Sequence, residues 1–329
     1  MNSIERHWEG VRLHVVTGKG GTGKTTVAAA LAIALATGGK KVLLVEVEER
    51  QGLAQLFDVP PLPYAERKLT VAPGGGDVFG LAVDARDAMH EYLEMYYRLG
   101  RAGRALDRMG VIDFATTIAP GMRDVLLTGK TYEATRRKVD NRHQYDAVVL
   151  DAPPTGRITR FLNVTAAVTT LARVGPVNRH AQLTMGLIRS PQTVVHIVTL
   201  LEEMPVQETR DAIDELRGED IPVGAVIVNE VRQPYLTGRQ LTAARNRRLD
   251  RDEIGAGLTA AGLTGSDTMI DQLVDEAADH ASRVALEKEQ RRLIDDTGRP
   301  VYELTRVPEG IDLAALYELA ESLREQGAA

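Results

Sequence analysis

The stretch Gly18-Lys19-Gly20-Gly21-Thr22-Gly23-Lys24-Thr25-Thr26 lies between an apolar run, Val11–Val16, and an alanine-rich run, Val27–Ala36. This order predicts a buried strand, a glycine-rich loop and a helix, and the loop has the spacing G-x-x-x-x-G-K-[ST]. Glycines leave no Cβ between backbone and ligand, so successive N–H groups can turn toward an anion at the positive end of the helix. We therefore expect a phosphate-binding loop that consists of Gly18, Gly20, Gly21, Thr22, Gly23, Lys24, Thr25 and Thr26.

A nucleotide and a metal ion are the ligands that this loop predicts. Lys24 can reach the β- and γ-phosphates of ATP or ADP, and the Thr25 hydroxyl can hold Mg²⁺. Further along the chain, the apolar run Tyr145–Leu150 delivers Asp151, and an acid at the tip of a buried strand is the second metal-orienting group of such sites. The alternative is a glycine-rich turn that matches by chance, but the flanking strand and helix favour the phosphate loop.

The segment after Asp151, Ala152–Arg157, contains two prolines and one glycine. A stiff segment with one flexible point suits a switch that responds to the γ-phosphate and moves the helix that follows. A plain strand-to-helix turn is the alternative, and the neighbouring Asp151 favours the switch.

Composition limits the class of protein. The chain has 329 residues, of which 43% are hydrophobic and 26% charged, as is ordinary for a soluble globular protein. The net charge of −6 gives no overall attraction to nucleic acid or anionic membrane. We see neither a signal-peptide pattern nor an apolar run long enough to span a bilayer, so we expect a cytoplasmic protein without stable membrane insertion. The absence of cysteine excludes disulfides, iron–sulfur clusters, Cys-ligated zinc and a thiolate site for arsenite.

Apolar runs along the chain predict a doubly wound, mainly parallel α/β sheet of about seven strands, the fold of P-loop NTPases. We expect one ATPase domain over 1–329, with helical insertions at 85–141 and 160–192 that form a subdomain. The charged segment 230–297 is expected to be a solvated helical flank. Besides the two strands above, the runs are Val42–Val47, Val78–Val83, Val194–Leu200, Val223–Val228 and Pro300–Leu304.

Two polar or aromatic features allow a structural and a functional interpretation. Asn229 follows a predicted strand, where its amide could contact an adenine edge or bond its own backbone in a turn. Tyr92, Tyr96 and Tyr97 form the densest aromatic cluster, which is more typical of a helix core than of a binding surface, although a binding surface stays open.

The loop resembles the deviant Walker A loop of dimeric ATPases because Lys19 follows its first glycine. In that group the extra lysine crosses the dimer interface to the partner's nucleotide; a solvated loop lysine is the alternative. The order of motifs is similar to the arsenite-pump and tail-anchored-protein-targeting ATPases (ArsA/Get type). Asp151–Arg157 resembles that family's second switch, Val226–Asn229 its adenine-contacting strand, and Leu304–Gly310 its loop over the base.

The resemblance implies a Mg²⁺-dependent ATPase that opens and closes as a homodimer, or as a heterodimer with a paralogous ATPase. Its client stays open, and a protein is one candidate. It also implies that Asn229 and Pro308 contact the base. Where the family's first switch has an Asp that positions the attacking water, this chain has Glu48, and where the second switch has His it has Arg157. We expect Lys19, Lys24, Glu48 and Asp151 to carry catalysis, with slow hydrolysis because the Glu48 carboxylate is one methylene longer.

Other classes of function share the loop. A small-molecule ligase or kinase of the dethiobiotin-synthetase type would need a substrate pocket beside the γ-phosphate. A partitioning ATPase on DNA or membrane would need a basic patch or a cationic terminal anchor, which segment 323–329 does not offer. A nucleotide-sensing scaffold that binds ATP without hydrolysis stays open because of the altered first switch.

Overall fold

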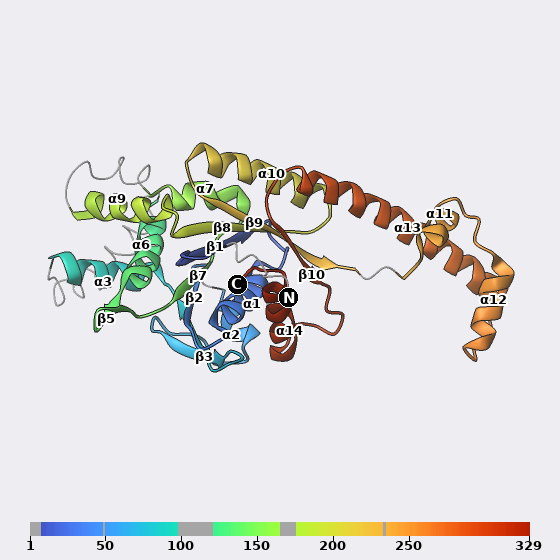
Figure 1. Cartoon of the computed structure of the whole chain (residues 1–329), viewed down its shortest axis with the longest axis horizontal. Coiled ribbons are helices and arrows are strands. Elements are labelled where there is room, and N and C mark those ends of the chain that lie inside the picture. Colours follow the sequence, from blue (N-terminus) through green and yellow to red (C-terminus); the bar gives the residue numbers. More distant parts are fainter. Residues whose placement is uncertain (1–7, 49, 98–120, 165–175, 233–234) are drawn as a thin grey trace.

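Strand β1 (Leu13–Gly18), buried at every position, lies inside an eight-stranded sheet with the order β10-β9-β8-β1-β7-β2-β4-β3 (Figure 1). The computed structural model describes residues 8–48, 50–97, 121–164, 176–232 and 235–329. All neighbouring strands in this sheet are parallel except β3, which runs antiparallel to β4. The other strands are β2 (Lys41–Glu46), β3 (Arg67–Val71), β4 (Asp77–Ala82), β7 (Ala147–Asp151), β8 (Thr193–Thr199), β9 (Val223–Val231) and β10 (Val301–Thr305).

The doubly wound fold is confirmed, with one strand more than the apolar runs predict. The extra strand, β3, lies at the edge of the sheet and is partly or fully exposed at every position. Its first two residues are Arg67 and Lys68, and charged side chains are typical of an edge that must not pair with another chain. A strand of this kind has no apolar run to reveal it. A separate two-stranded hairpin, formed by β5 (Lys138–Val139) and β6 (Arg142–His143), comes directly before β7 in the chain.

Helices cover both faces of the sheet. One face carries α1 (Lys24–Ala36), α2 (Gly52–Leu56) and α14 (Leu313–Glu325), whose apolar side chains form one core cluster. The alanines of α1 are almost all fully buried, so this helix lies close to the sheet and to α14. The other face carries α3 (Ala85–Tyr97), α6 (Met122–Arg136), α7 (Thr155–Leu162), α9 (Pro176–Ile188) and α10 (Glu203–Gly218).

The predicted insertion 85–141 contains α3 and α6, and the predicted insertion 160–192 contains α9 and the last residues of α7. Helix α6 packs against α3 and against α9. Segments 98–120 and 165–175, the middle parts of both insertions, lie outside the described residues. That the insertions form a subdomain of their own therefore stays a prediction.

The charged segment near the C-terminus forms a helical arm. Helix α13 (Asp267–Asp295) has 29 residues and extends away from the sheet, with α11 (Gly238–Arg245) and α12 (Arg251–Ala260) along its outer part (Figure 1). An exposed ion pair of 3.1 Å joins Arg247, in the segment between α11 and α12, to Asp275 of α13, and α12 has no buried residue. This agrees with a solvated helical flank, but its projection was not predicted. Among the described residues, no helix combines the length and the apolar character that crossing a membrane requires.

Candidate functional site

The glycine-rich loop joins the carboxyl end of β1 to the start of α1, as predicted. At Gly18 a Cβ would lie 2.2 Å from the carbonyl oxygen of Val198, so no side chain fits there. Gly23 has φ +84°, and a Cβ on it would lie 2.3 Å from the Asn229 amide nitrogen. Both positions need glycine, the first for close approach of two backbones and the second also for its left-handed conformation.

The loop is braced by the chain's own polar groups. The Asn229 side-chain amide, at the end of β9, donates to the Thr22 carbonyl oxygen at 3.0 Å. The Thr22 hydroxyl donates to the Lys19 carbonyl oxygen at 2.8 Å. Asn229 thus fixes the loop from a strand about 200 residues away. Its contact with adenine stays a prediction.

Thr25 and Asp151 meet at the carboxyl edge of the sheet. The Thr25 hydroxyl donates to Asp151 Oδ2 at 2.7 Å, and Asp151 is 7% exposed. Asp151 Oδ1 is buried and accepts no hydrogen bond from any residue that the structure describes. Burial raises the pKa of Asp151 to about 7, with Glu46 and Glu48 adding to this and Thr25 and Lys24 opposing it. Because burial makes the ionised form of Asp151 costly, a nearby cation would stabilise that form.

A second buried carboxylate, Glu46, is a site residue that the sequence analysis did not single out. It ends β2, lies opposite Asp151 in the register of β2 and β7, and is 3% exposed. Its Oε1 accepts from the Gly52 N–H at 2.7 Å, and burial raises its pKa. Its position as the last residue of a buried strand, at the edge where Asp151 also ends a strand, is the signal that could have identified it.

A cavity of about 470 Å³ lies beside the loop. Of the predicted site residues it is lined by Gly21, Gly23, Lys24, Thr25, Thr26, Glu48 and Asp151. Gly18, Gly20, Thr22, Lys19, Asn229 and Pro308 are not in its lining. Pro308 is exposed in the segment between β10 and α14, and Ile311 from that same segment does line the cavity. The structure therefore brings the phosphate loop, both switch regions and the C-terminal loop to one cavity.

Lys19 is held by its own chain. Its Nζ lies 2.7 Å from Glu208 Oε1 on α10, and the other oxygen of Glu208 accepts from the Thr155 hydroxyl at 2.9 Å. The hydrogen bond from Lys19, joined by that from Thr155, holds the pKa of Glu208 below its usual range. Thr155 begins α7 and lies within the predicted second switch, directly after its two prolines. Glu208 thus ties Lys19 to the second switch.

The segment after β2, which contains Glu48 of the predicted first switch, is held by the Gln51 side chain. Gln51, which has φ +54°, pairs its amide with the Leu62 backbone in both directions, at 2.8 and 3.1 Å. Glu48 is half-buried in the cavity wall, and Glu49 lies outside the described residues. In the second switch, Arg157 lies 3.8 Å from Asp124 of α6 and is largely exposed.

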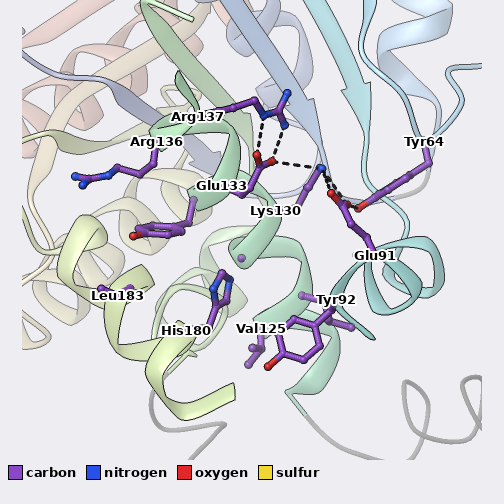
Figure 2. A pocket seen from close by; sticks show the side chains of 14 residues that line it. Tyr64, Glu91, Tyr92, Val125, Lys130, Glu133, Arg136, Arg137, His180 and Leu183 are labelled. Atoms are coloured by element: carbon purple, nitrogen blue, oxygen red, sulfur yellow. Dashed lines mark hydrogen bonds and ion pairs between the residues drawn. The ribbon is translucent and has the colours of Figure 1, made fainter. Parts of the chain in front are cut away.

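A second cavity, of about 310 Å³, lies among α3, α6 and α9 (Figure 2). Its polar end is a network in which Lys130 lies 2.7 Å from Glu91 and 3.4 Å from Glu133, and Arg137 pairs with Glu133. Figure 2 shows these charged groups directed at one another. Of the predicted tyrosine cluster, Tyr92 lines this cavity, while the side chains of Tyr96 and Tyr97 lie outside the described residues.

Comparison with known proteins assigns this arrangement to a family. The model of the family described as anion-transporting ATPase matches residues 11–188, which include the phosphate loop, Glu46 and Asp151. The chain belongs to this family. This confirms the resemblance drawn from the motifs, and membership of an ATPase family implies a nucleotide site.

Individual relatives agree. The chain is 54% identical to "ATPase BagA" of Mycobacterium tuberculosis over 97% of its own length and 94% of that protein. It is 25% identical to "Putative arsenical pump-driving ATPase 2" of Aquifex aeolicus, over 67% of this chain and 80% of that protein. It is also 25% identical to "ATPase GET3" of Kluyveromyces lactis, over 66% of this chain and 71% of the relative. These matches favour an ATPase over the ligase or kinase alternative.

Proposed function

We propose that this family member is a Mg²⁺-dependent ATPase that works as a dimer, which closes and opens with the nucleotide state. The observation that carries the proposal is the Thr25–Asp151 hydrogen bond in a cavity that the phosphate loop also lines. These groups are 126 residues apart in the chain, and the fold joins them where a triphosphate and its metal would lie.

The residues present fit a magnesium ion. Asp151 Oδ1 is a buried oxygen without a hydrogen-bond partner in the described part of the chain, and the Thr25 hydroxyl lies beside it. Mg²⁺ prefers oxygen ligands and takes one or two carboxylates together with substrate phosphates and water.

Each residue then has one task in hydrolysis. Lys24 and the loop N–H groups bind the phosphates, while Thr25 and Asp151 hold the metal, which neutralises charge on the β- and γ-phosphates. Glu48 orients a water whose oxygen attacks the γ-phosphorus as the bond to ADP breaks, releasing ADP and phosphate. The longer side chain of Glu48 makes this step slow. Asn229 and Pro308 are the proposed contacts of the base.

Dimer closure gives Lys19 its task on the partner's nucleotide. The dimer is either homomeric or formed with a paralogous ATPase, and a protein is one candidate for its client. The absence of cysteine argues against the arsenite chemistry that the name of the Aquifex relative suggests. The contact with Glu208 restrains Lys19 within its own chain, so it competes with closure if Lys19 has to leave Glu208 to reach the partner's nucleotide.

Titration calorimetry and phosphate release test the proposal on the full chain. We expect wild type to bind ATP in the presence of Mg²⁺ and to release phosphate slowly, and Lys24→Ala to weaken binding by roughly 10- to 100-fold, because a charge-assisted contact is lost. Lys19→Ala should retain ATP affinity but lose at least about tenfold in turnover, as for other cations supplied in trans.

Lys68→Ala is the matched control, because Lys68 is exposed and pairs with Asp77 on the distant edge of the sheet. Undiminished ATP affinity in Lys24→Ala would contradict the phosphate site. Turnover of Lys19→Ala equal to wild type would remove the role in trans. Tight ATP binding with no phosphate release in wild type would favour the nucleotide-sensing scaffold.

A further inference from the structure

The two oxygens of Glu46 have different surroundings. Oε1 accepts from the Gly52 N–H at 2.7 Å, at the start of α2. Oε2 is buried and has no hydrogen-bond partner among the residues that the structure describes. Burying a carboxylate oxygen without a partner is costly, so an unpaired oxygen in a side chain that is 3% exposed calls for an explanation.

Asp151 repeats this pattern one strand away. Glu46 and Asp151 face each other in the parallel register of β2 and β7, and both line the cavity beside the phosphate loop. Each has one satisfied oxygen and one buried oxygen without a partner in the described structure. Thr25 lies near both carboxylates. Its hydroxyl donates to Asp151, and a Cβ built on Gly52 would lie within 3.4 Å of both Glu46 and Thr25.

Two structural explanations do not account for these oxygens. The hydrogen bond from Gly52 explains why a carboxylate helps to begin α2, but it uses only Oε1 of Glu46. A proton shared between the two carboxyl groups would join them directly, yet among the hydrogen bonds described here none links Glu46 to Asp151. The unpaired oxygens of Glu46 and Asp151 therefore indicate a ligand that attracts two carboxylates at once, namely a cation.

We propose that Glu46 is the second carboxylate of the metal site and that, with Asp151 and Thr25, it binds a divalent cation before any nucleotide arrives. The inference rests on the proposed function for the nature of the site and extends it to a residue and a binding order. Two carboxylates cancel the charge of Mg²⁺, and water completes its coordination. A site with Asp151 as its only acid would instead depend on the phosphates of ATP for this charge.

The same residue links the metal to the first switch. Because Glu46 Oε1 holds the Gly52 N–H, a cation on Oε2 acts on the side chain that fixes the start of α2. The segment between them contains Glu48, the proposed water-orienting residue. Binding of the metal therefore orders the first switch through Glu46, at the end of β2, whereas the nucleotide acts on the switch from the cavity.

The test uses Mn²⁺ as the probe and the full chain without nucleotide. Electron paramagnetic resonance of free Mn²⁺ should show one site per chain in wild type, and Mg²⁺ should compete for it. Glu46→Gln should weaken Mn²⁺ binding by about 10- to 100-fold, the range for loss of a group that holds or orients a metal. The amide oxygen of Gln can still accept from Gly52, so the fold is retained.

Glu309→Gln is the matched control, because Glu309 is an exposed acid in the segment that also contributes Ile311 to the cavity. It removes the same charge and should change Mn²⁺ affinity less than about twofold. If Glu46→Gln binds Mn²⁺ as tightly as wild type, Glu46 is not a ligand. If wild type binds no Mn²⁺ without nucleotide but binds Mn²⁺ together with ATP, the binding order is wrong while the proposed ATPase function stands.

A second measurement does not depend on the variant. Addition of Mg²⁺ alone should raise the thermal midpoint of nucleotide-free wild type, because a ligand that binds the folded state stabilises it. No shift at saturating Mg²⁺ would overturn the proposal. Failure of the proposed function would look different, since ATP would then not bind with or without metal.

Discussion

The two cavities of this protein both contain acidic side chains, but these side chains are satisfied in opposite ways. Between α3, α6 and α9, Glu91 and Glu133 pair with Lys130 and Arg137, so charges are balanced within the chain (Figure 2). Beside the phosphate loop, Glu46 and Asp151 each keep a buried oxygen without a partner in the described residues. A balanced network stabilises the fold by itself, whereas an unbalanced one is costly until a ligand completes it.

Whether the acidic groups are paired within the chain distinguishes a structural cavity from a functional one more clearly than the size or shape of the cavity does. The helical cavity is lined largely by apolar and aromatic side chains, and its polar end is already paired. The cavity beside the loop keeps unsatisfied carboxylates and a buried lysine, Lys24. Substitutions that remove one charge should therefore have opposite effects on stability in the two places.

The largest effect is expected from Asp151→Asn, in metal-free and nucleotide-free protein. Burial raises the pKa of Asp151 from 3.8 to about 7, so the ionised carboxylate destabilises the fold at pH 8. The raised pKa corresponds to at most about 4 kcal/mol, and we expect the amide to stabilise by about 2 to 4 kcal/mol. Urea denaturation in the presence of a chelator measures this difference.

The pH dependence has a definite sign. A carboxyl group whose pKa is raised in the folded state contributes stability that is fully present below 3.8 and is lost as pH rises through about 7. The advantage of Asp151→Asn should thus be greatest at pH 8 and shrink toward pH 4. A variant less stable than wild type at pH 8 would show that Asp151 is balanced within the chain after all.

Lys130→Met tests the other cavity and should destabilise. The Lys130 side chain is 13% exposed and pairs with Glu91 and Glu133 from two helices. Its loss leaves Glu91 without its cation, while Glu133 keeps Arg137. We expect a loss of about 1 to 3 kcal/mol by urea denaturation at pH 7. Lys138→Met is the control, because Lys138 is exposed on β5 and should change stability by less than about 0.5 kcal/mol.

Lowering the pH should reduce the effect of Lys130→Met. Burial raises the pKa of Glu133, but Arg137 and Lys130 outweigh this and hold it below its usual value. The group therefore contributes stability that is present above pH 4.5 and is lost as pH falls through its folded pKa. Equal losses at pH 7 and pH 4 would show that Lys130 acts through packing alone.

The same contrast explains what could be predicted from the sequence. The loop, Thr25 and Asp151 were found because motif spacing and apolar runs are local patterns that directly reflect strand, turn and helix. The parallel sheet followed from the same runs. Edge strand β3 and the projecting arm were missed, because charged sequence shows that a segment is solvated but not where it lies.

Contacts between residues that are far apart in the chain could not be predicted from the sequence either. Glu46 became a site residue only when the register placed it opposite Asp151, more than 100 residues away. His14 and His196 are both fully buried and share a hydrogen bond of 3.1 Å, yet neither lies in a recognisable motif. Glu208 is one of several acids on an amphipathic helix until the fold brings Lys19 and Thr155 to it. Such pairings depend on tertiary geometry, which no local pattern contains.

Glu208→Gln should have the smallest effect, since it acts on an ion pair whose side chains are 29% and 33% exposed. Partly exposed pairs contribute about 1 kcal/mol or less, so freeing Lys19 should strengthen ATP-dependent dimerisation by about fivefold or less. Sedimentation with a non-hydrolysable ATP analogue at several salt concentrations measures this, and the advantage should fade at high salt as screening weakens the pair in wild type.

Glu203→Gln is the control for Glu208→Gln, because Glu203 is an exposed acid in the first turn of the same helix. If Glu208→Gln instead weakens the dimer, the Lys19–Glu208 pair belongs to the closed state and orients Lys19 toward the partner. If it strengthens the dimer, the pair is a restraint within one chain that competes with closure. The sign of this small effect therefore decides whether Glu208 orients Lys19 toward the partner's nucleotide or withholds Lys19 from it.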